Sequence, residues 1–299
     1  MNRHTPVLLS EVVEVLQPNL GSEFVDLTAG YGGHSTALIE SIGDSGFGYL
    51  FDKDQQAVEY LKNKFKNNNH IRVNHADFGA LDWKNDIPMV DIILADIGVS
   101  SPQIDNPERG FSFQSDAKLD MRMDQSQQLS AYEVVNTYPE KQLADILYEN
   151  AEERQSRKLA NAIVKARSLS PITSTKQLAD IITDTIPKTG KIHPATKCFQ
   201  AIRIEVNNEL ESLRTLLENA PQRLNIGGRL AIISFHSLED RMVKQAFTNL
   251  SKPQKDEFGQ NVSEPSFKRV TKKPIMGSKY DKSNPRSRSA KLRVVEKIK

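Results

Sequence analysis

The sequence predicts an α/β fold in which an all-helical segment interrupts a mostly parallel sheet. The first half of the chain alternates strand-like and helix-like segments, and this alternation is typical of parallel strands covered by helices. It stops between about residues 105 and 198, where helical patterns follow one another without a convincing strand. A strand-like run then returns after Gly227 and Gly228, which indicates that the sheet resumes beyond the insertion.

Six segments are the strand candidates of this sheet. The first four end in polar or glycine-containing turns, where open α/β sheets place their ligands. The other two follow the insertion, and the last of them closes the sheet. In chain order, the candidates are residues 23–28, 46–52, 70–76, 89–96, 229–235 and 291–298.

Helical periodicity covers much of the remaining chain. Residues 54–65 place their apolar side chains on one face, and Asp54 can cap the N-terminus of this helix. Within the insertion, residues 139–149 and 152–168 repeat such an apolar face. A third helix of the insertion opens with a capping box at Ser174, so we expect a small helical bundle there.

The predicted elements divide the chain into two domains. We expect one long helix over about residues 199–219 and a surface loop over residues 252–266. The sheet-bearing domain then comprises residues 1–104 and 199–299, and the inserted helical domain comprises residues 105–198. A length of 299 residues suits two domains.

The composition is that of an ordinary globular protein, with 38% apolar and 26% charged residues. No apolar run approaches the roughly 20 residues of a membrane span, and the apolar stretch near the N-terminus is too short for a signal peptide. We therefore expect a cytoplasmic protein with no membrane partner. The single cysteine, Cys198, excludes an internal disulfide and any multi-cysteine metal site, and we expect no metal.

The net charge of +2 hides an asymmetry along the chain. Residues 268–299 hold twelve lysines and arginines against Asp281 and Glu296, so this run carries +10 and leaves −8 for the remainder. A basic segment on an acidic body can bind a polyanion such as RNA. A solvated charged tail is the alternative interpretation, and for a charge run taken alone it is the more common one.

A glycine-rich loop follows the first predicted strand. Asp26 ends this strand, and Gly30, Gly32 and Gly33 precede a helix that we expect to begin near Ser35. Glycine allows positive φ angles and a close approach of a ligand to the backbone. The helix N-terminus offers unpaired N–H groups to a carboxylate or phosphate. Such a loop alone is only a weak indication of a nucleotide-type ligand.

Asp52 strengthens this indication, because it ends the second strand 22 positions after Gly30, where a carboxylate can accept both ribose hydroxyls. A dinucleotide fingerprint would have a third glycine where Ser35 lies, so nothing remains to hold a pyrophosphate. The pattern D-x-T-x-G-x-G-G resembles instead the glycine loop of class I methyltransferases, which implies a Rossmann-like fold and S-adenosylmethionine as the cofactor. Phe78, after the third strand, would then hold adenine, although a phenylalanine alone is more typical of a core.

The fourth predicted strand ends in the run D-I-G-V-S-S-P-Q at residues 96–103. We interpret Asp96, Ser100 and Ser101 as candidate catalytic residues of an amino-methyltransferase. Hydrogen-bond acceptors on the N–H groups of an amine direct its lone pair toward the methyl group, and alignment of two bound reactants then provides much of the rate. Each serine is equally typical of a turn cap.

Two other polar residues are weaker candidates. His236 follows the fifth predicted strand, but Ser237 and Asp240 resemble a capping box, so a helix start is the favoured role of this turn. Enzymes that methylate a pyrimidine ring carbon use a cysteine nucleophile, usually next to a proline. Cys198 lies in T-K-C-F-Q, far from the strand ends, which favours an amine acceptor and a buried structural thiol.

Together these segments resemble the MraW/RsmH ribosomal RNA methyltransferases. The matching runs extend from one end of the chain to the other, which makes the resemblance specific. They are H-T-P-V-L-L at 4–9, D-L-T-A-G-Y-G-G-H at 26–34, D-I-G-V-S-S-P-Q at 96–103, R-G-F-S-F at 109–113, L-D-M-R-M-D at 119–124, H-P-A-T at 193–196, F-Q-A-I-R-I-E-V-N at 199–207, S-F-H-S-L-E-D-R at 234–241 and N-P-R-S-R-S at 284–289.

The resemblance implies that the protein methylates the exocyclic N4 amine of a cytidine in the decoding region of 16S rRNA. It implies that the helical insertion helps to recognise RNA and that the small ribosomal subunit is the partner. It does not identify a proton acceptor, and the sequence does not define the oligomeric state. The residues that it implies in cofactor binding are Gly32, Gly33, His34, Asp52, Phe78, Asp96 and Gln103.

Two other functions remain open at this point. A small-molecule methyltransferase could use the same fold, although the basic segment and an insertion of some ninety residues favour a large anionic substrate. A non-catalytic RNA-binding assembly factor could also keep the fold. The presence of Asp26, Asp52 and Asp96 at three predicted strand ends argues against the loss of catalysis.

Overall fold

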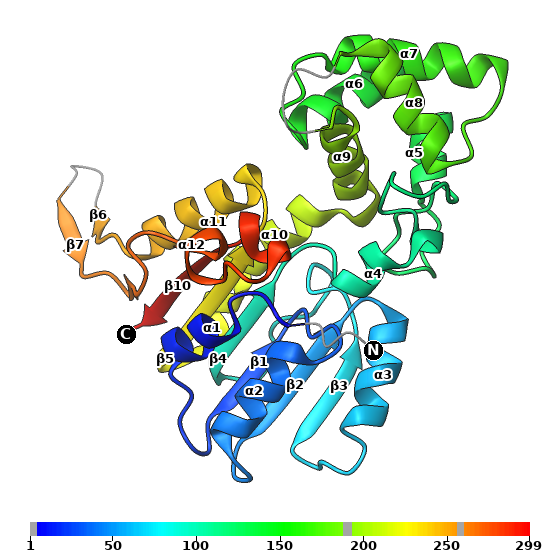
Figure 1. Cartoon of the computed structure of the whole chain (residues 1–299). Coiled ribbons are helices and arrows are strands. Elements are labelled where there is room, and N and C mark those ends of the chain that lie inside the picture. The colour runs from blue at the N-terminus through cyan, green and yellow to red at the C-terminus, as the bar shows by residue number, and fades with distance from the viewer. Residues whose placement is uncertain (1–4, 188–192, 256–259) are drawn as a thin grey trace. The chain divides into compact units, whose positions relative to one another are not determined.

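A computed structural model describes residues 5–187, 193–255 and 260–299. His4, the first residue of the H-T-P-V-L-L run, lies outside the described residues. The chain forms two compact units. The sheet unit comprises Met1–Gly98 and Glu211–Lys299, and the helical unit comprises Val99–Leu210 (Figure 1).

The sheet unit contains an eight-stranded sheet in the order β3-β2-β1-β4-β5-β10-β8, with β9 paired to β10. The pairs among β1 to β5 are parallel, whereas β10 is antiparallel to β5, β8 and β9. The predicted α/β class with a mostly parallel sheet is therefore confirmed. The strands are β1 (Glu23–Asp26), β2 (Phe47–Asp52), β3 (Ile71–His75), β4 (Val90–Asp96), β5 (Leu224–Ser234), β8 (Phe267–Arg269), β9 (Ile275–Met276) and β10 (Lys291–Lys297).

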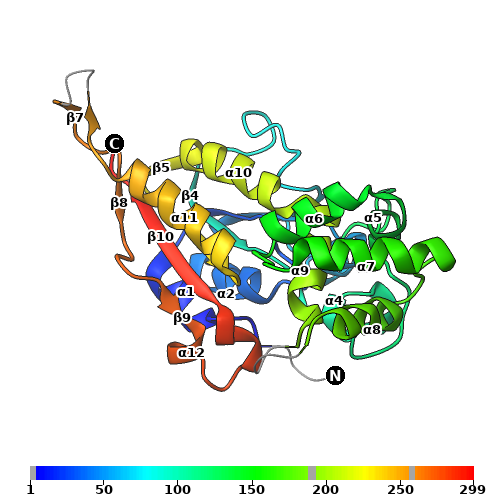
Figure 2. The same ribbon diagram turned by 90° about the horizontal axis from the view of Figure 1, so that it is seen from above.

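Helices cover both faces of this sheet, as the view from above shows (Figure 2). Alternate residues of β4 explain why: Ile92 and Leu94 enter one core together with residues of α1 and α2, whereas Ile93 and Ala95 enter another with residues of α10 and α11. The helices of the sheet unit are α1 (Leu9–Leu16), α2 (Gly33–Ile42), α3 (Gln55–Lys64), α10 (Glu209–Asn219), whose first two residues belong to the helical unit, α11 (Ser237–Leu250) and α12 (Gly277–Tyr280), with 3-10 turns η2 (Ala220–Arg223) and η3 (Pro285–Ser289).

The helical unit has its own apolar core, formed by residues of α5 to α9 and of the loop that precedes them. Ser174 caps α8 through a capping box with Gln177, as predicted. The elements of this unit are α4 (Ser101–Asp105), the 3-10 turn η1 (Pro107–Arg109), α5 (Ala131–Thr137), α6 (Glu140–Glu149), α7 (Ser156–Leu169), α8 (Thr175–Thr185) and α9 (Ala195–Asn207).

Three sequence predictions about local structure are wrong. The long helix over 199–219 is two helices, because Asn208 between α9 and α10 has a left-handed backbone with φ 50°. The surface loop over 252–266 includes a hairpin of β6 (Gln254–Lys255) and β7 (Asn261–Ser263), although residues 256–259 lie outside the described chain. The cap of α11 is His236 with Glu239, one residue before the predicted Ser237.

Candidate active site

Three aspartates lie together at one edge of the sheet unit. Asp26, Asp52 and Asp96 are the last residues of β1, β2 and β4, and β1 lies between the other two strands (Figure 1). The carboxyl ends of neighbouring parallel strands share one sheet edge, which is where open α/β sheets bind ligands. The structure thus brings together three of the predicted site residues.

Asp26 holds the glycine loop in place through two hydrogen bonds. Its Oδ2 accepts a hydrogen bond from the Ser35 hydroxyl at 2.6 Å, and its Oδ1 accepts one from the Thr28 N–H at 3.1 Å. Burial raises the pKa of the Asp26 carboxyl to about 6, although these hydrogen bonds oppose the shift. These two hydrogen bonds orient the loop and leave a lone pair on each Asp26 oxygen, so Asp26 stays a predicted cofactor residue.

The glycine loop has the backbone that the sequence predicts. Gly30 and Gly32 have φ angles of 53° and 74°, which favour glycine. A Cβ atom at Gly33, the first residue of α2, would lie 2.4 Å from Cγ of Pro6. The chain before α1 therefore presses directly on the start of α2, and the absence of a side chain at Gly33 permits this contact.

Asp52 ties this loop to the end of β2. Its Oδ2 accepts a hydrogen bond from the Gly30 N–H at 2.7 Å, and its Oδ1 accepts one from the Asp54 N–H at 2.8 Å. Burial raises the pKa of the Asp52 carboxyl to about 6. Because each carboxylate oxygen has two lone pairs, Asp52 can still accept hydrogen bonds from two hydroxyls of a bound ligand.

His34 connects the loop with β4 and with the N-terminal strap, which we define as residues 5–8. Its Nε2 lies 2.9 Å from the carbonyl oxygen of Val7, and since a carbonyl only accepts, Nε2 carries the hydrogen. The Nδ1 atom lies 3.7 Å from Oδ2 of Asp96. Two of the predicted cofactor residues, His34 and Asp96, therefore lie close to each other.

Asp96 has the most unusual environment of the three aspartates. Its Oδ1 is buried and has no hydrogen-bond partner within the part of the chain that the structure describes. Burial, followed by the charges of Asp26 and Glu239, raises the pKa of the Asp96 carboxyl to about 8. A buried acceptor among like charges suits a cationic ligand or a hydrogen-bond donor, because either would compensate the missing interaction.

The remaining site candidates are Phe78 in the sheet unit and three residues in the helical unit. Phe78 is partly buried and packs against the apolar core between the sheet and α10, and its carbonyl accepts a hydrogen bond from Nε1 of Trp83 at 3.1 Å. Ser100, Ser101 and Gln103 belong to the helical unit, because the chain leaves the sheet unit after Gly98. Oε1 of Gln103 accepts a hydrogen bond from the Ser100 N–H at 2.9 Å, so Ser100 is the N-cap of α4.

His236, the secondary candidate, has a structural role at the start of α11. The buried carboxylate of Glu239 accepts hydrogen bonds from the Phe235 N–H at 2.8 Å and from the His236 N–H at 3.2 Å. Sequence reasoning missed Glu239, whose charge contributes to the raised pKa of Asp96. It also missed Thr28, whose Oγ1 accepts a hydrogen bond from the Asp96 N–H at 2.6 Å.

Over residues 5–187, 193–255 and 260–299, no group of three or more His, Cys, Asp or Glu side chains could hold a metal ion. Across the same ranges, no helix is long and apolar enough to cross a membrane.

Comparison with known proteins decides the family. The model of the MraW methylase family matches residues 1–298. The chain belongs to the MraW methylase family. Membership confirms the resemblance found in the sequence, and it confirms the prediction of a methyltransferase that uses S-adenosylmethionine.

Relatives of similar length support this membership. The chain is 46% identical over 308 residues to Ribosomal RNA small subunit methyltransferase H of Caldicellulosiruptor saccharolyticus, with 100% of both chains covered. It is 44% identical over 304 residues to the protein of that name from Fusobacterium nucleatum, with 99% of this chain and 97% of the relative covered.

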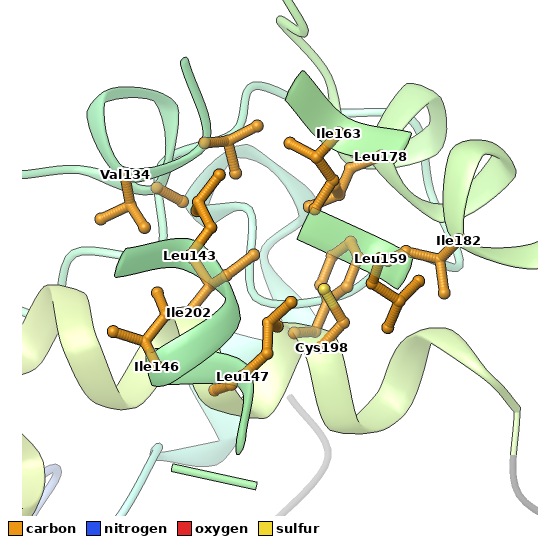
Figure 3. Close-up of a cluster of buried hydrophobic side chains, with 14 of the residues drawn as sticks. Val134, Leu143, Ile146, Leu147, Leu159, Ile163, Leu178, Ile182, Cys198 and Ile202 are labelled. Carbon is orange, nitrogen blue, oxygen red and sulfur yellow. The ribbon is translucent and has the colours of Figure 1, made fainter. Parts of the chain in front are cut away.

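Cys198 lies in the core of the helical unit, among apolar side chains such as Leu147 and Leu159 (Figure 3). Burial raises the pKa of its thiol well above the ordinary value, so the thiolate needed for nucleophilic attack is scarce. We expect Cys198→Ala to keep the wild-type rate of methyl transfer, with at most a modest loss of stability from the small cavity. A rate reduced by several orders of magnitude in a folded variant would refute an amine acceptor.

Proposed function

We propose that this protein transfers a methyl group from S-adenosylmethionine to the exocyclic N4 amine of a cytidine in the decoding region of 16S rRNA. The observation that carries this proposal is the identity of 46% and 44%, over essentially full length, to proteins named Ribosomal RNA small subunit methyltransferase H. The sequence motifs and the buried Cys198 support an amine rather than a ring carbon as the acceptor. Action on ribosomal RNA would place the protein in the cytoplasm.

The sheet unit offers groups that fit the cofactor. Asp52 would accept hydrogen bonds from the ribose hydroxyls, and Gly30, Gly32 and Gly33 would allow the ligand to approach the backbone. Phe78 would contact the adenine, as the family resemblance implies. When bound, S-adenosylmethionine supplies a methyl group on a positively charged sulfur, and the unpartnered Oδ1 of Asp96 fits a site for a positive charge.

Asp96 would also prepare the acceptor amine. The lone pair of an exocyclic amine is delocalised into the base, and an acceptor on its N–H group directs that pair away from the ring. Oδ1 of Asp96 is free to accept such a hydrogen bond. A carboxyl with a pKa raised to about 8 is also suited to take the proton that the amine loses after methylation. His34, 3.7 Å away, would hold Asp96 in position.

The helical unit would contribute to recognition of the RNA substrate. We propose residues 105–198 as a recognition domain inserted between the two parts of the methyltransferase domain, residues 1–104 and 199–299. Ser100 and Ser101 remain proposed catalytic residues, and Gln103 remains a proposed cofactor residue. The capping role of Ser100 and Gln103 is the competing explanation.

One experiment tests this function against its alternatives. The protein is incubated with tritiated S-adenosylmethionine and small subunits that lack the modification, and the labelled nucleoside is identified by mass spectrometry. We expect N4-methylated cytidine. Cofactor binding with transfer only to a small molecule would indicate the first alternative, and RNA binding without any transfer would indicate a non-catalytic assembly factor.

A further inference from the structure

The basic C-terminal run is a folded part of the sheet unit, and two groups can be distinguished among its cations. Some are neutralised within the protein. Lys291 and Arg293 both pair with Asp240, at 3.0 and 2.7 Å, and Lys268 pairs with Glu296 at 2.6 Å. These three cations hold β8 and β10 to their neighbours, and carboxylates of the protein compensate their charges.

A second group of cations is concentrated in a short segment, which we name the basic corner: residues 272–290, with β9, α12 and η3. Asp281 is its single acidic residue, and the Asp281 carboxylate is occupied by the Leu8 N–H, at 3.1 Å, and by the Ser287 hydroxyl. The segment therefore carries six exposed cationic side chains and one carboxylate, which is engaged inside the fold. They are Lys272, Lys273, Lys279, Lys282, Arg286 and Arg288.

The basic corner has a defined shape. Gly277 is buried, and a Cβ atom there would collide with the carbonyl of Ser287, so α12 and η3 are in direct contact. The Gly277 N–H donates to the Ala290 carbonyl at 3.0 Å, which fixes the start of α12 to the last residue of the segment. A docked, hydrogen-bonded segment does not behave as a solvated tail, which was the alternative interpretation of the charge run.

The N-terminal strap links the basic corner to the candidate active site within the sheet unit. On one side, Asp281 binds the Leu8 N–H, and Nδ2 of Asn284 donates to the Thr5 carbonyl at 3.1 Å. On the other side, the Val7 carbonyl accepts from His34, which lies 3.7 Å from Asp96. A polyanion bound at the basic corner would therefore lie near the residues proposed for methyl transfer.

An exposed aromatic ring lies within this charged segment. Tyr280 has 53% of its surface exposed, and Nζ of Lys279 lies 4.9 Å from the centre of its ring. Aromatic rings among cationic side chains are a common platform for single-stranded nucleic acid, because every base can stack on them. An acidic protein surface would use the cations but would gain little from the ring.

We propose that the basic corner binds the phosphate backbone of a single-stranded RNA segment next to the target nucleotide, with one base stacked on Tyr280. This inference rests on the proposed function, because it assumes an RNA substrate. Lys279, Lys282 and Arg288 contact phosphates, and none of the three has a carboxylate partner among the described residues. The surface orients the RNA irrespective of base sequence, as phosphate contacts do.

The first test compares two variants with the same change in charge. Lys279, Lys282 and Arg288 are replaced by glutamate in one, and the exposed Lys62, Lys66 and Lys84 in the other. Binding to a single-stranded decoding-region oligonucleotide is measured over a salt series. Each lost phosphate contact should flatten the slope of log affinity against log salt by about 0.7, so the first variant should lose about 2 from the slope. The control variant should lose much less, and both should bind S-adenosylmethionine normally.

The second test isolates the ring. Tyr280→Ala should weaken binding of the same oligonucleotide by about ten-fold, whereas Tyr280→Phe should bind nearly as the wild type does. Equal effects of both charge variants, or no effect of Tyr280→Ala, would overturn the proposal. Loss of binding to an acidic peptide instead of RNA would indicate a protein partner and would also overturn it.

These outcomes are distinct from a failure of the proposed function. Methyl transfer by the wild-type protein to unmodified small subunits tests that function directly. Suppose that the wild type methylates the subunits and that the variant with glutamate at Lys279, Lys282 and Arg288 has an unchanged KM for them. The proposed RNA-binding role of the basic corner is then wrong, whereas the proposed methyltransferase function is retained. If the proposal is correct, KM rises while kcat at saturating substrate changes little.

Discussion

Replacement of Asp96 by asparagine is expected to reduce kcat for methyl transfer by about 100-fold or more, the usual effect of removing a charged group that acts in a transition state. Asparagine has nearly the same shape, so the sheet edge should remain intact. What it lacks is the negative charge that would receive the amine hydrogen bond. The measurement is single-turnover transfer of a labelled methyl group to unmodified small subunits.

Proton uptake and release give an independent readout of the same residue. The pKa of Asp96 is about 8 in the folded protein, against 3.8 for the ordinary group. A cationic ligand beside it would lower this pKa, so we expect S-adenosylmethionine to release a proton when it binds near pH 7. The heat of binding, measured in buffers of different ionisation enthalpy, reports this proton. Release should be absent in Asp96→Asn and weaker for the uncharged product of the reaction.

The same shift predicts how stability depends on pH. Between about pH 4 and 8, the folded cofactor-free protein retains a proton on Asp96 that the unfolded chain has lost. The contribution of Asp96 to the free energy of unfolding therefore falls as the pH rises through this window, by at most about 1.4 kcal/mol per pH unit. Asp96→Asn should flatten this slope. An unchanged pH profile together with wild-type kcat would exclude Asp96 from both roles.

Removal of the Asp52 carboxylate is expected to raise the dissociation constant for S-adenosylmethionine at least ten-fold. Hydrogen bonds to a charged group contribute about 1.5–3 kcal/mol, and Asp52→Ala would remove them from the ribose hydroxyls. It would also release the Gly30 N–H, which Asp52 holds at 2.7 Å, and so loosen the loop. Calorimetry measures the constant directly.

Two further variants separate these effects. Asp52→Asn keeps one oxygen acceptor and should lose less affinity than Asp52→Ala. Asp44→Ala removes an exposed carboxylate from the turn after α2 and should bind the cofactor as the wild type does. If Asp52→Ala is folded and binds with wild-type affinity, Asp52 does not contact the cofactor.

Six strands, β1 to β5 and β10, were predictable because each of them has its own local signal in the sequence. Buried runs such as 89–96 are rich in isoleucine and leucine, and glycines or polar residues end them. Short elements gave no such signal: β9 has two residues and exists because it pairs with β10. The break at Asn208 depends on a single left-handed residue, and apolar periodicity continues across it.

The candidate site shows the same limit. The aspartates at the strand ends could be chosen from spacing, but their partners come from distant parts of the chain. Thr28 binds the backbone of Asp96 across 68 positions, and the strap reaches His34 across 27. Such contacts arise from the order of the strands, which a single sequence does not display. The glycines of the loop were easier to predict, because few residues other than glycine adopt a positive φ angle.

The place of β10 in the sheet has a consequence for how the chain is made. This strand follows the other described strands of the sheet in chain order, yet it lies between β5 and β8. During synthesis, the helical unit is made before β10 and can fold early, whereas the sheet unit lacks an interior strand until β10 has been made. The residues that bind β10, including Asp240 and Arg229, therefore find their partners only after β10 has been made, so we expect the sheet unit to be completed later than the helical unit.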